Sequence, residues 1–185
     1  GFARAPLLVM AVLCAKESRR ASVVKLLLKH GADVDKRRSG DGRSALQLVA
    51  GLGLLDVASQ FIESDANVDA RDKMGRTALH FAALGRGVLG DRLAVAEALL
   101  AAKADASLRD CEGKTAADIV TDLGFKKLLK KAAVGRRLRE KMLQQLTSDM
   151  MKAVACSDLV KVKEVMERYK KRGIGLNETV AGEEW

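Results

Sequence analysis

Apolar side chains recur along the chain at spacings of three and four residues, in short stretches bounded by glycine, aspartate and asparagine. The pattern is strongest just after Gly75, where Leu79, Ala82 and Ala83 fall on one face of a helix. Gly75 predicts the end of a tight turn, and the hydroxyl of Thr77 can accept the free amide hydrogens of a helix that starts next. The pattern therefore predicts a turn followed by a short helix with one buried face.

The same stretch occurs three times. A copy begins at Gly42, 33 residues before Gly75, and another begins at Gly113, 38 residues after it. A period near 33 residues is typical of arrays in which each supersecondary unit buries its apolar face against its neighbours.

The segment Thr77-Ala78-Leu79-His80-Phe81-Ala82 resembles the Thr-Pro-Leu-His-x-Ala pattern of the ankyrin repeat family. The resemblance implies an all-α solenoid in which helix-turn-helix repeats stack and are joined by β-hairpin-like turns. We expect an array over residues 1–132, with repeats at about 1–38, 39–71, 72–109 and 110–132.

Within the repeats, the second unit is the most regular, and its helices are predicted at about Ala45–Gly51 and Leu55–Glu63. The second helix of the third repeat is expected later, at about Leu93–Ala101. Aligning the first and third repeats at a 72-residue offset gives both the same insertion between their helices, at about Leu13–Arg20 and Leu84–Arg92. We expect these insertions to form loops at the same edge of alternate repeats.

Helix exits are marked by Gly31, Asp65 and Lys103, which stand at equivalent positions where the backbone turns left-handed. Lysine at such a position costs roughly 1 kcal/mol relative to glycine. The fourth repeat is predicted to contain helices at Ala116–Asp122 and Phe125–Ala132. Lysines on the outer face of the second helix suit a repeat that closes the array.

Residues 133–185 differ from the array. Val134–Leu146 is predicted to form a basic amphipathic helix, and Met150–Val162 resembles another ankyrin helix pair. Gly173 and Asn177 follow where such a repeat would end. The segment is either a fifth, divergent repeat packed on the array, which we favour because an isolated pair cannot bury its apolar face, or the start of a second array.

Composition supports helix packing. Apolar residues make up 48 % of the chain and aromatic residues 3 %, with a single proline. No apolar run approaches eighteen residues, so we expect no membrane span, and the short run Leu7–Cys14 is interpreted as a core helix and not as a signal peptide. Three scattered cysteines without metal-ligand spacing favour a reducing, intracellular location, cytoplasmic or nuclear. Because the chain begins with Gly1, we expect it to be a fragment.

The resemblance implies a non-catalytic module that binds a protein or peptide on the concave face built by turn tips and first helices. It implies no cofactor, metal or small-molecule substrate, and a partner that carries acidic and apolar groups. The positions that match turn tips or first-helix ends are Asp41, Arg43, Gln47, Leu52, Lys73, Met74, Arg76, Leu84, Cys111, Glu112 and Lys114.

The distribution of charge along the chain suggests an alternative function. The formal net charge is +9, of which residues 126–185 contribute +7, from 15 basic and 8 acidic side chains. A basic amphipathic stretch can bind an anionic membrane, nucleic acid or an acidic protein, although the lack of aromatic residues disfavours single-strand stacking. The residues concerned are Lys126, Lys127, Lys130, Lys131, Arg136, Arg137, Arg139 and Lys141.

Catalysis has little support in the sequence. Residues 85–90 satisfy the dinucleotide-binding pattern G-x-G-x-x-G, but that motif needs a preceding strand, and here a helix is predicted, so we expect a flexible loop. His80 matches the structural histidine of the repeat, and His30 has no metal ligand or catalytic partner at useful spacing. An enzyme whose catalytic part lies outside this chain is a third hypothesis.

Overall fold

The computed structural model describes residues 6–156 and 159–171, and in these residues it contains helices and turns but no strand. One isolated antiparallel bridge joins Arg109 and Thr115. This confirms the all-α class. The helices are α1 (Leu7–Cys14), α2 (Glu17–Lys29), α3 (Ala45–Leu52), α4 (Leu55–Glu63), α5 (Ala78–Leu84), α6 (Leu89–Ala101), α7 (Ala116–Ile119), α8 (Leu123–Ala155) and α9 (Leu159–Lys171).

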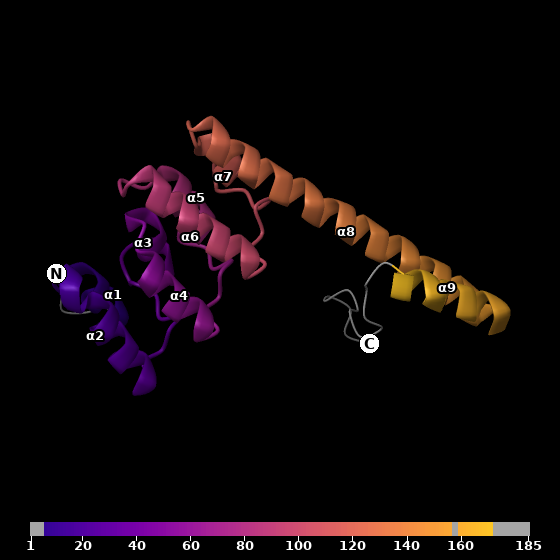
Figure 1. Cartoon of the computed structure of the whole chain (residues 1–185), viewed down its shortest axis with the longest axis horizontal. Coiled ribbons are helices and arrows are strands. Elements are labelled where there is room, and N and C mark those ends of the chain that lie inside the picture. The colour runs from indigo at the N-terminus through magenta and orange to yellow at the C-terminus, as the bar shows by residue number, and fades with distance from the viewer. Residues whose placement is uncertain (1–5, 157–158, 172–185) are drawn as a thin grey trace. The chain divides into compact units, whose positions relative to one another are not determined.

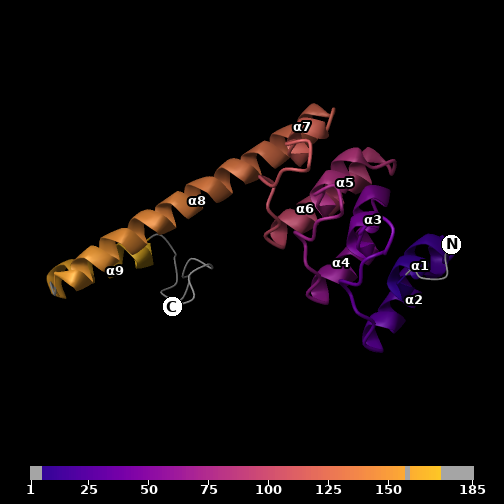
Figure 2. The same ribbon diagram turned by 180° about the vertical axis from the view of Figure 1, so that it is seen from behind.

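Contacts divide the chain into two compact units, Gly1–Ala133 and Val134–Trp185. In the first unit, helices pack on their counterparts in the next repeat. The first helices form one layer, α1 on α3, α3 on α5 and α5 on α7, and the second helices form another, α2 on α4 and α4 on α6 (Figures 1 and 2). The predicted stacking of helix-turn-helix repeats is confirmed.

Stacking creates a continuous core. Val49 and Phe61 come from the second repeat, Leu79 and Leu99 come from the third, and all four belong to one cluster of buried apolar side chains. At the C-terminal end of this cluster, Phe125 is fully buried. A single helix pair has too little apolar surface to be stable alone, so this shared core is what holds the repeats together.

Polar pairs start the first helices. Ser44 with Gln47 and Thr77 with His80 form capping boxes, in which each partner satisfies a free backbone amide of the other. Thr115 with Asp118 does the same at the start of α7. The predicted role of Thr77 as a cap is confirmed, and the same kind of pair starts the first helix of the second, third and fourth repeats, whereas α1 begins after Pro6 without a side-chain cap.

The predicted loops of the first and third repeats are corrected by the structure. α2 begins at Glu17 and α6 at Leu89, so part of each insertion is helical. Both helices have 13 residues, whereas α4 has 9 and matches its predicted bounds. The two insertions therefore lengthen the second helix at its N-terminal end by about one turn.

Left-handed exits follow three helices as predicted. The φ angles are +79° at Gly31, +57° at Asp65 and +66° at Lys103. Asp65 and Lys103 are the only residues other than glycine with positive φ in the described part of the chain. The fourth repeat differs from its prediction, because α7 ends at Ile119 and not at Asp122.

The predicted helices Phe125–Ala132 and Val134–Leu146 are parts of a single helix, α8, which has 33 residues and runs through Gly135. In the second unit, α8 and α9 pack through Leu146 and Val165. Met150–Ala155, predicted to open a new helix pair, is the end of α8. Gly173 and Asn177 lie outside the described residues, and a fifth repeat stays a prediction.

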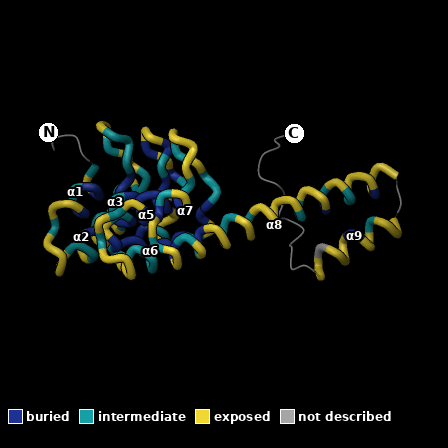
Figure 3. Tube along the Cα trace, turned by 90° about the horizontal axis from the view of Figure 1, so that it is seen from above, coloured by how far each residue is buried: buried dark blue, intermediate teal, exposed yellow. Residues whose placement is uncertain are grey.

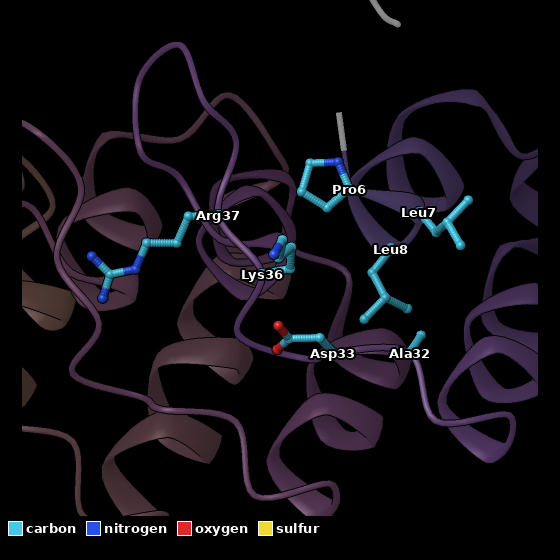
Figure 4. A pocket seen from close by; sticks show the side chains of 7 residues that line it. All are labelled: Pro6, Leu7, Leu8, Ala32, Asp33, Lys36 and Arg37. Carbon is cyan, nitrogen blue, oxygen red and sulfur yellow. The ribbon is translucent and has the colours of Figure 1, made fainter. Parts of the chain in front are cut away.

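The outer side of the first repeat is less covered than the equivalent sides of the inner repeats. Leu7 is 68 % exposed, whereas its counterparts Leu46 and Leu79 are 2 % and 1 % exposed. Beside Leu7 and Leu8 lies a hollow of about 420 Å³, closed on one side by Ala32 and Asp33 (Figure 4). The difference arises because Leu46 and Leu79 pack against the repeat before them.

Among the described residues, every helix is either too short or too polar to cross a bilayer.

Candidate partner-binding surface

Each turn between repeats is shaped by an aspartate. The carboxylate oxygen Oδ1 of Asp72 accepts the N–H groups of Met74, at 2.9 Å, and of Arg76, at 2.8 Å. Asp110 accepts the N–H groups two and four residues further on, each at 2.9 Å. Gly75, with φ +72°, supplies the left-handed backbone that the turn needs. The sequence Asp-x-x-Gly thus fixes the shape of the tips at 72–76 and 110–114, and in the first tip Asp41 accepts the N–H of Arg43 at 3.2 Å.

The turns are bonded edge to edge. The N–H of Lys73 donates to the carbonyl of Asp41, at 3.1 Å, and the N–H of Cys111 donates to the carbonyl of Met74, at 2.9 Å. The turns protrude on one side of the first unit, with their tips exposed (Figure 3). Three tips from three connections therefore form one row, which we call the turn-tip surface, over residues 39–43, 72–76 and 110–114.

Two predicted arginines are held beneath this surface. Arg76 donates to the Asp72 carboxylate at 3.1 and 3.2 Å, and the side chain of Asp72 is only 1 % exposed. The guanidinium carbons of Arg43 and Arg76 lie 4.9 and 5.2 Å from the centroid of the Phe81 ring. Their side chains remain 30 % and 24 % exposed. Both arginines support the turns and offer only part of their surface to a partner.

Two aspartates of the turns, Asp41 and Asp110, have lowered pKa values and stay charged at neutral pH. Burial alone would raise the pKa of Asp41, but hydrogen bonds from Arg38 and Arg43 outweigh it and lower the pKa. Burial would raise the pKa of Asp110, but hydrogen bonds from N–H groups of its own turn together outweigh it, so that pKa is also lowered. The turn-tip surface therefore mixes fixed negative charges with exposed cations.

The remaining tip residues are accessible. Met74 is 46 % exposed. Lys73 is exposed and its Nζ donates to the carbonyl of Ser39 at 3.3 Å. Lys114 pairs with Glu112, with 2.8 Å between Nζ and Oε2. Cys111 is a free, exposed thiol.

Gln47, predicted to face a partner, is contradicted by the structure. Its side chain is 1 % exposed, and Nε2 donates to the carbonyls of Ala70, at 2.7 Å, and Arg76, at 2.8 Å. The side-chain oxygen accepts the N–H of Ser44 at 2.9 Å. All polar atoms of the amide are used inside the protein, so Gln47 joins the second repeat to the third and is not a contact residue.

Leu52 and Leu84 lie at the other ends of the first helices. They are 42 % and 46 % exposed. Because α3 and α5 begin directly after the turns, seven to eight residues separate these leucines from the tips, or about 12 Å along a helix. The structure therefore brings the tip residues together and places Leu52 and Leu84 apart from them, at the opposite end of the same helices.

The glycine-rich stretch 85–90 packs closely against the backbone of the second repeat. An added Cβ at Gly85 would lie 2.1 Å from the carbonyl oxygen of Gly51, and one at Gly87 would lie 2.3 Å from that of Leu52. Arg92 ties the stretch down by donating to the carbonyl of Gly87 at 2.9 Å and to that of Ala82 at 2.8 Å. Helix α5 precedes the motif, so a dinucleotide site is excluded, and the loop predicted as flexible is anchored.

His80 is a structural residue, as predicted. Its Nδ1 accepts the N–H of Thr77 at 3.2 Å, and its Nε2 lies 3.1 Å from the carbonyl of Lys114 in the next repeat. Burial lowers the pKa of His80 more than the bond to Lys114 raises it. The described residues contain no group of side chains with metal-ligand geometry.

Sequence reasoning missed three arginines beside the turns. Arg37, Arg71 and Arg109 are exposed and occupy one register, at separations of 34 and 38 residues. The repeat period could have found them, because Arg71 and Arg109 directly precede the aspartates that start the turns. They lie outside the turn tips and the helix ends, which are the positions that the family resemblance indicates.

The basic stretch of the alternative hypothesis lies on α8 and is divided between the two units. Lys127, Lys130 and Lys131 are exposed in the first unit. In the second unit, Arg136 pairs with Glu140, with 3.1 Å between Nε and Oε1. Binding of acidic surfaces by this stretch stays a prediction.

The comparison with protein families agrees with this architecture. A family model described as "Ankyrin repeats (3 copies)" matches residues 10–110, which is more than half of the chain. The chain belongs to the ankyrin repeat family. Repeats of this family are modules for protein–protein interaction and typically have no catalytic role.

Similar proteins include the "Ankyrin repeat and SAM domain-containing protein 6" of Danio rerio, 41 % identical over 80 residues, or 43 % of this chain. The "Neurogenic locus notch homolog protein 1" is 37 % identical over 68 residues in Danio rerio, or 37 % of this chain, and 32 % identical over 101 residues in Xenopus tropicalis, or 54 % of this chain. The matches span 11 %, 3 % and 4 % of these relatives, so the chain corresponds to a small part of each.

Among solved structures, the ankyrin repeat domain of Bcl-3, described as a unique member of the IkappaB protein family, superimposes with a TM-score of 0.57 and 28 % identity. The match covers 66 % of this chain and 50 % of that one.

Proposed function

We propose that this chain is a protein-binding scaffold or regulatory module that holds its partner on the turn-tip surface and the adjoining ends of the first helices. The observation that carries the proposal is the bonded row of three turns, which keeps Met74 exposed among fixed charges. An apolar side chain held in the open by a rigid backbone is a contact that loses little entropy on binding. The exposed side chains of Leu52 and Leu84, at the opposite ends of α3 and α5, offer a second apolar contact that is separate from the tips.

The partner that fits is a protein or peptide with acidic and apolar groups. Lys73 and Lys114 supply exposed cations, and Met74 supplies an adaptable apolar contact. Gln47 has no place in this surface. Arg43 and Arg76 contribute in part, because their guanidinium groups are engaged with the buried Asp72 and the ring of Phe81.

A capture experiment tests the proposal. Immobilised wild-type chain is compared with a tip variant, Lys73→Ala/Met74→Ala/Glu112→Ala, which changes exposed side chains and leaves the supporting arginines intact. The control, Lys29→Ala/Val88→Ala/Glu97→Ala, changes exposed residues of the same kinds away from the tips. Proteins retained by the wild type and the control should be lost by the tip variant. Equal capture by all three chains would remove the turn tips from the function.

A further inference from the structure

We propose that Arg37, Arg71 and Arg109, the arginine row, bind an extended acidic segment of a protein that carries a carboxylate at about every third residue. The inference rests on the proposed function and specifies the chemistry of its partner.

The three side chains stand at equivalent positions of successive repeats. Arg37 Nη1 donates to the carbonyl of Arg71 at 2.9 Å, and Arg71 Nη2 donates to the carbonyl of Arg109 at 2.5 Å. Arg109 Nη1 donates to the carbonyl of Gly113, in its own turn, at 2.6 Å. Each repeat therefore presents the same group at the same place, and each group is fixed by backbone.

These arginines keep their charge available. In the described residues, none of the three forms an ion pair with a carboxylate, whereas Arg38, Arg43 and Arg76 each pair with Asp41 or Asp72. Hydrogen bonds from Thr115 lower the pKa of Asp118, and Arg109 adds to this shift only through space. A guanidinium has five N–H donors, and the bonds to carbonyls use one in each case. Planar forks with free donors suit the bidentate binding of carboxylates.

Fixing the side chains in advance favours binding. An exposed arginine normally loses rotamer freedom when it captures an anion, and that loss offsets most of the value of a surface ion pair. Here the bond to the neighbouring carbonyl has already ordered the side chain.

The spacing of the row determines the spacing of the ligand. Packed helices lie about 8–10 Å apart, so equivalent arginines of adjacent repeats are separated by a similar distance. A peptide in the extended polyproline II conformation advances about 3.1 Å per residue and completes one turn in three residues, so every third side chain lies on the same face. A carboxylate at every third position therefore meets successive arginines.

An acidic peptide fits better than a nucleic acid. Asp35 and Asp69 stand two residues before Arg37 and Arg71 and accept N–H groups of the next repeat at 3.0 and 2.8 Å. A continuous phosphate chain would meet these negative charges, whereas a peptide can place neutral residues there. The turns also lack an exposed aromatic ring for base stacking, since Phe81 is buried.

The test uses two fluorescein-labelled nonapeptides of equal composition, Glu-Ser-Gly repeated three times and an isomer with the three glutamates adjacent. Fluorescence anisotropy is measured with the wild-type chain, with Arg37→Gln/Arg71→Gln/Arg109→Gln, and with a control that loses the same net charge, Lys25→Gln/Lys29→Gln/Arg86→Gln, at exposed positions. The spaced peptide should bind more tightly than its isomer, and the row variant should weaken it about tenfold, as expected when three exposed ion pairs are lost. The control should change the affinity by less than about twofold.

Several results would overturn the inference: no binding of the spaced peptide by the wild type at low salt, equal losses in both variants, or equal affinity for the two peptides. Tighter binding of a nine-nucleotide single strand, lost in the row variant, would assign the row to nucleic acid instead. If the triple variant fails to fold, Arg109→Gln alone, whose bond stays within its own turn, should weaken the spaced peptide about twofold. If the peptide does not bind as expected but the tip variant loses the proteins that the wild type captures, the arginine row is ruled out and the proposed function still holds.

Discussion

The first and third repeats have the same internal spacing, and equivalent residues lie 72 positions apart. Both contain a second helix of 13 residues. Yet Leu7 is 68 % exposed, while Leu79, its counterpart, is 1 % exposed. The same residue at the same position of the motif is a surface residue in one repeat and a core residue in the other, because only the third repeat has a described neighbour on that side.

The loops between their helices show the same effect. The third repeat has Gly87 where the first has Ala15, and Gly87 lies against the backbone of Leu52 in the second repeat. Burial and close approach are thus properties of the interface between repeats. They restrict which residues the third repeat can have at positions where the first repeat is not restricted. The following substitutions probe this difference, from the largest expected effect to the smallest.

Leu79→Ala should lower the free energy of unfolding of the chain by about 2–5 kcal/mol, since it leaves a cavity between repeats two and three. Leu7→Ala, at the equivalent position, should change it by less than about 0.5 kcal/mol. Urea unfolding followed by circular dichroism measures both. Similar losses in the two variants would show that position in the motif, and not the neighbouring repeat, sets the stability.

Gly85→Ala should destabilise the fold by about 1–3 kcal/mol, because its Cβ would collide with backbone atoms of Gly51 that cannot move aside alone. Gly90→Ala is the matched control. No atom lies within 4 Å of its added Cβ, and Gly90 stands inside α6, so the change should stabilise by up to about 1 kcal/mol. Thermal melting should shift in opposite directions, and a shift in the same direction would contradict the close approach.

Acidification from pH 7 to pH 5 should lower the stability of the chain. The pKa of His80 is below its ordinary value in the folded protein, so below that ordinary value the unfolded chain binds more protons and is favoured. His80→Gln should flatten this dependence, since Gln47 stands at the same position of the second repeat and makes the equivalent bonds. In the first repeat the equivalent position is occupied by Leu8, which has no ionisable side chain. An unchanged pH profile in His80→Gln would assign the effect to other groups.

Lys103→Gly should stabilise the third repeat by up to about 1 kcal/mol, because lysine is held at φ +66°, where glycine is unstrained. The first repeat has Gly31 at this position, with φ +79° and no atom within 4 Å of an added Cβ. Gly31→Lys should therefore destabilise by a similar amount. Urea midpoints measure both exchanges, and the prediction fails if the two changes have the same sign.

Much of the fold could be predicted from the sequence because its causes are local and repeated. The bounds of α4, the capping by Thr77 and the left-handed exit at Lys103 each follow from residues within a few positions. Helix ends that depend on neighbours were less predictable. α8 continues through Gly135 because helical residues flank it on both sides and nothing ends the helix there.

The candidate site was predicted less completely. Exposed positions such as Met74 and Glu112 follow from the register of the turn. The burial of Gln47 does not, because its amide is satisfied by carbonyls 23 and 29 residues away. The ordering of Arg37 and Arg71 in the arginine row likewise depends on bonds that cross from one repeat to the next.

By itself, the sequence determined the repeat, its turns, the cap at Thr77 and the left-handed helix exits, because these depend on dihedral preferences and hydrogen bonds between near neighbours. Only the tertiary structure decided which equivalent positions are buried, why Gly85 and Gly87 must lack a side chain, and which arginines keep an unpaired charge. Those properties arise where two repeats meet, and identical local sequence gives different surroundings according to what lies beside it.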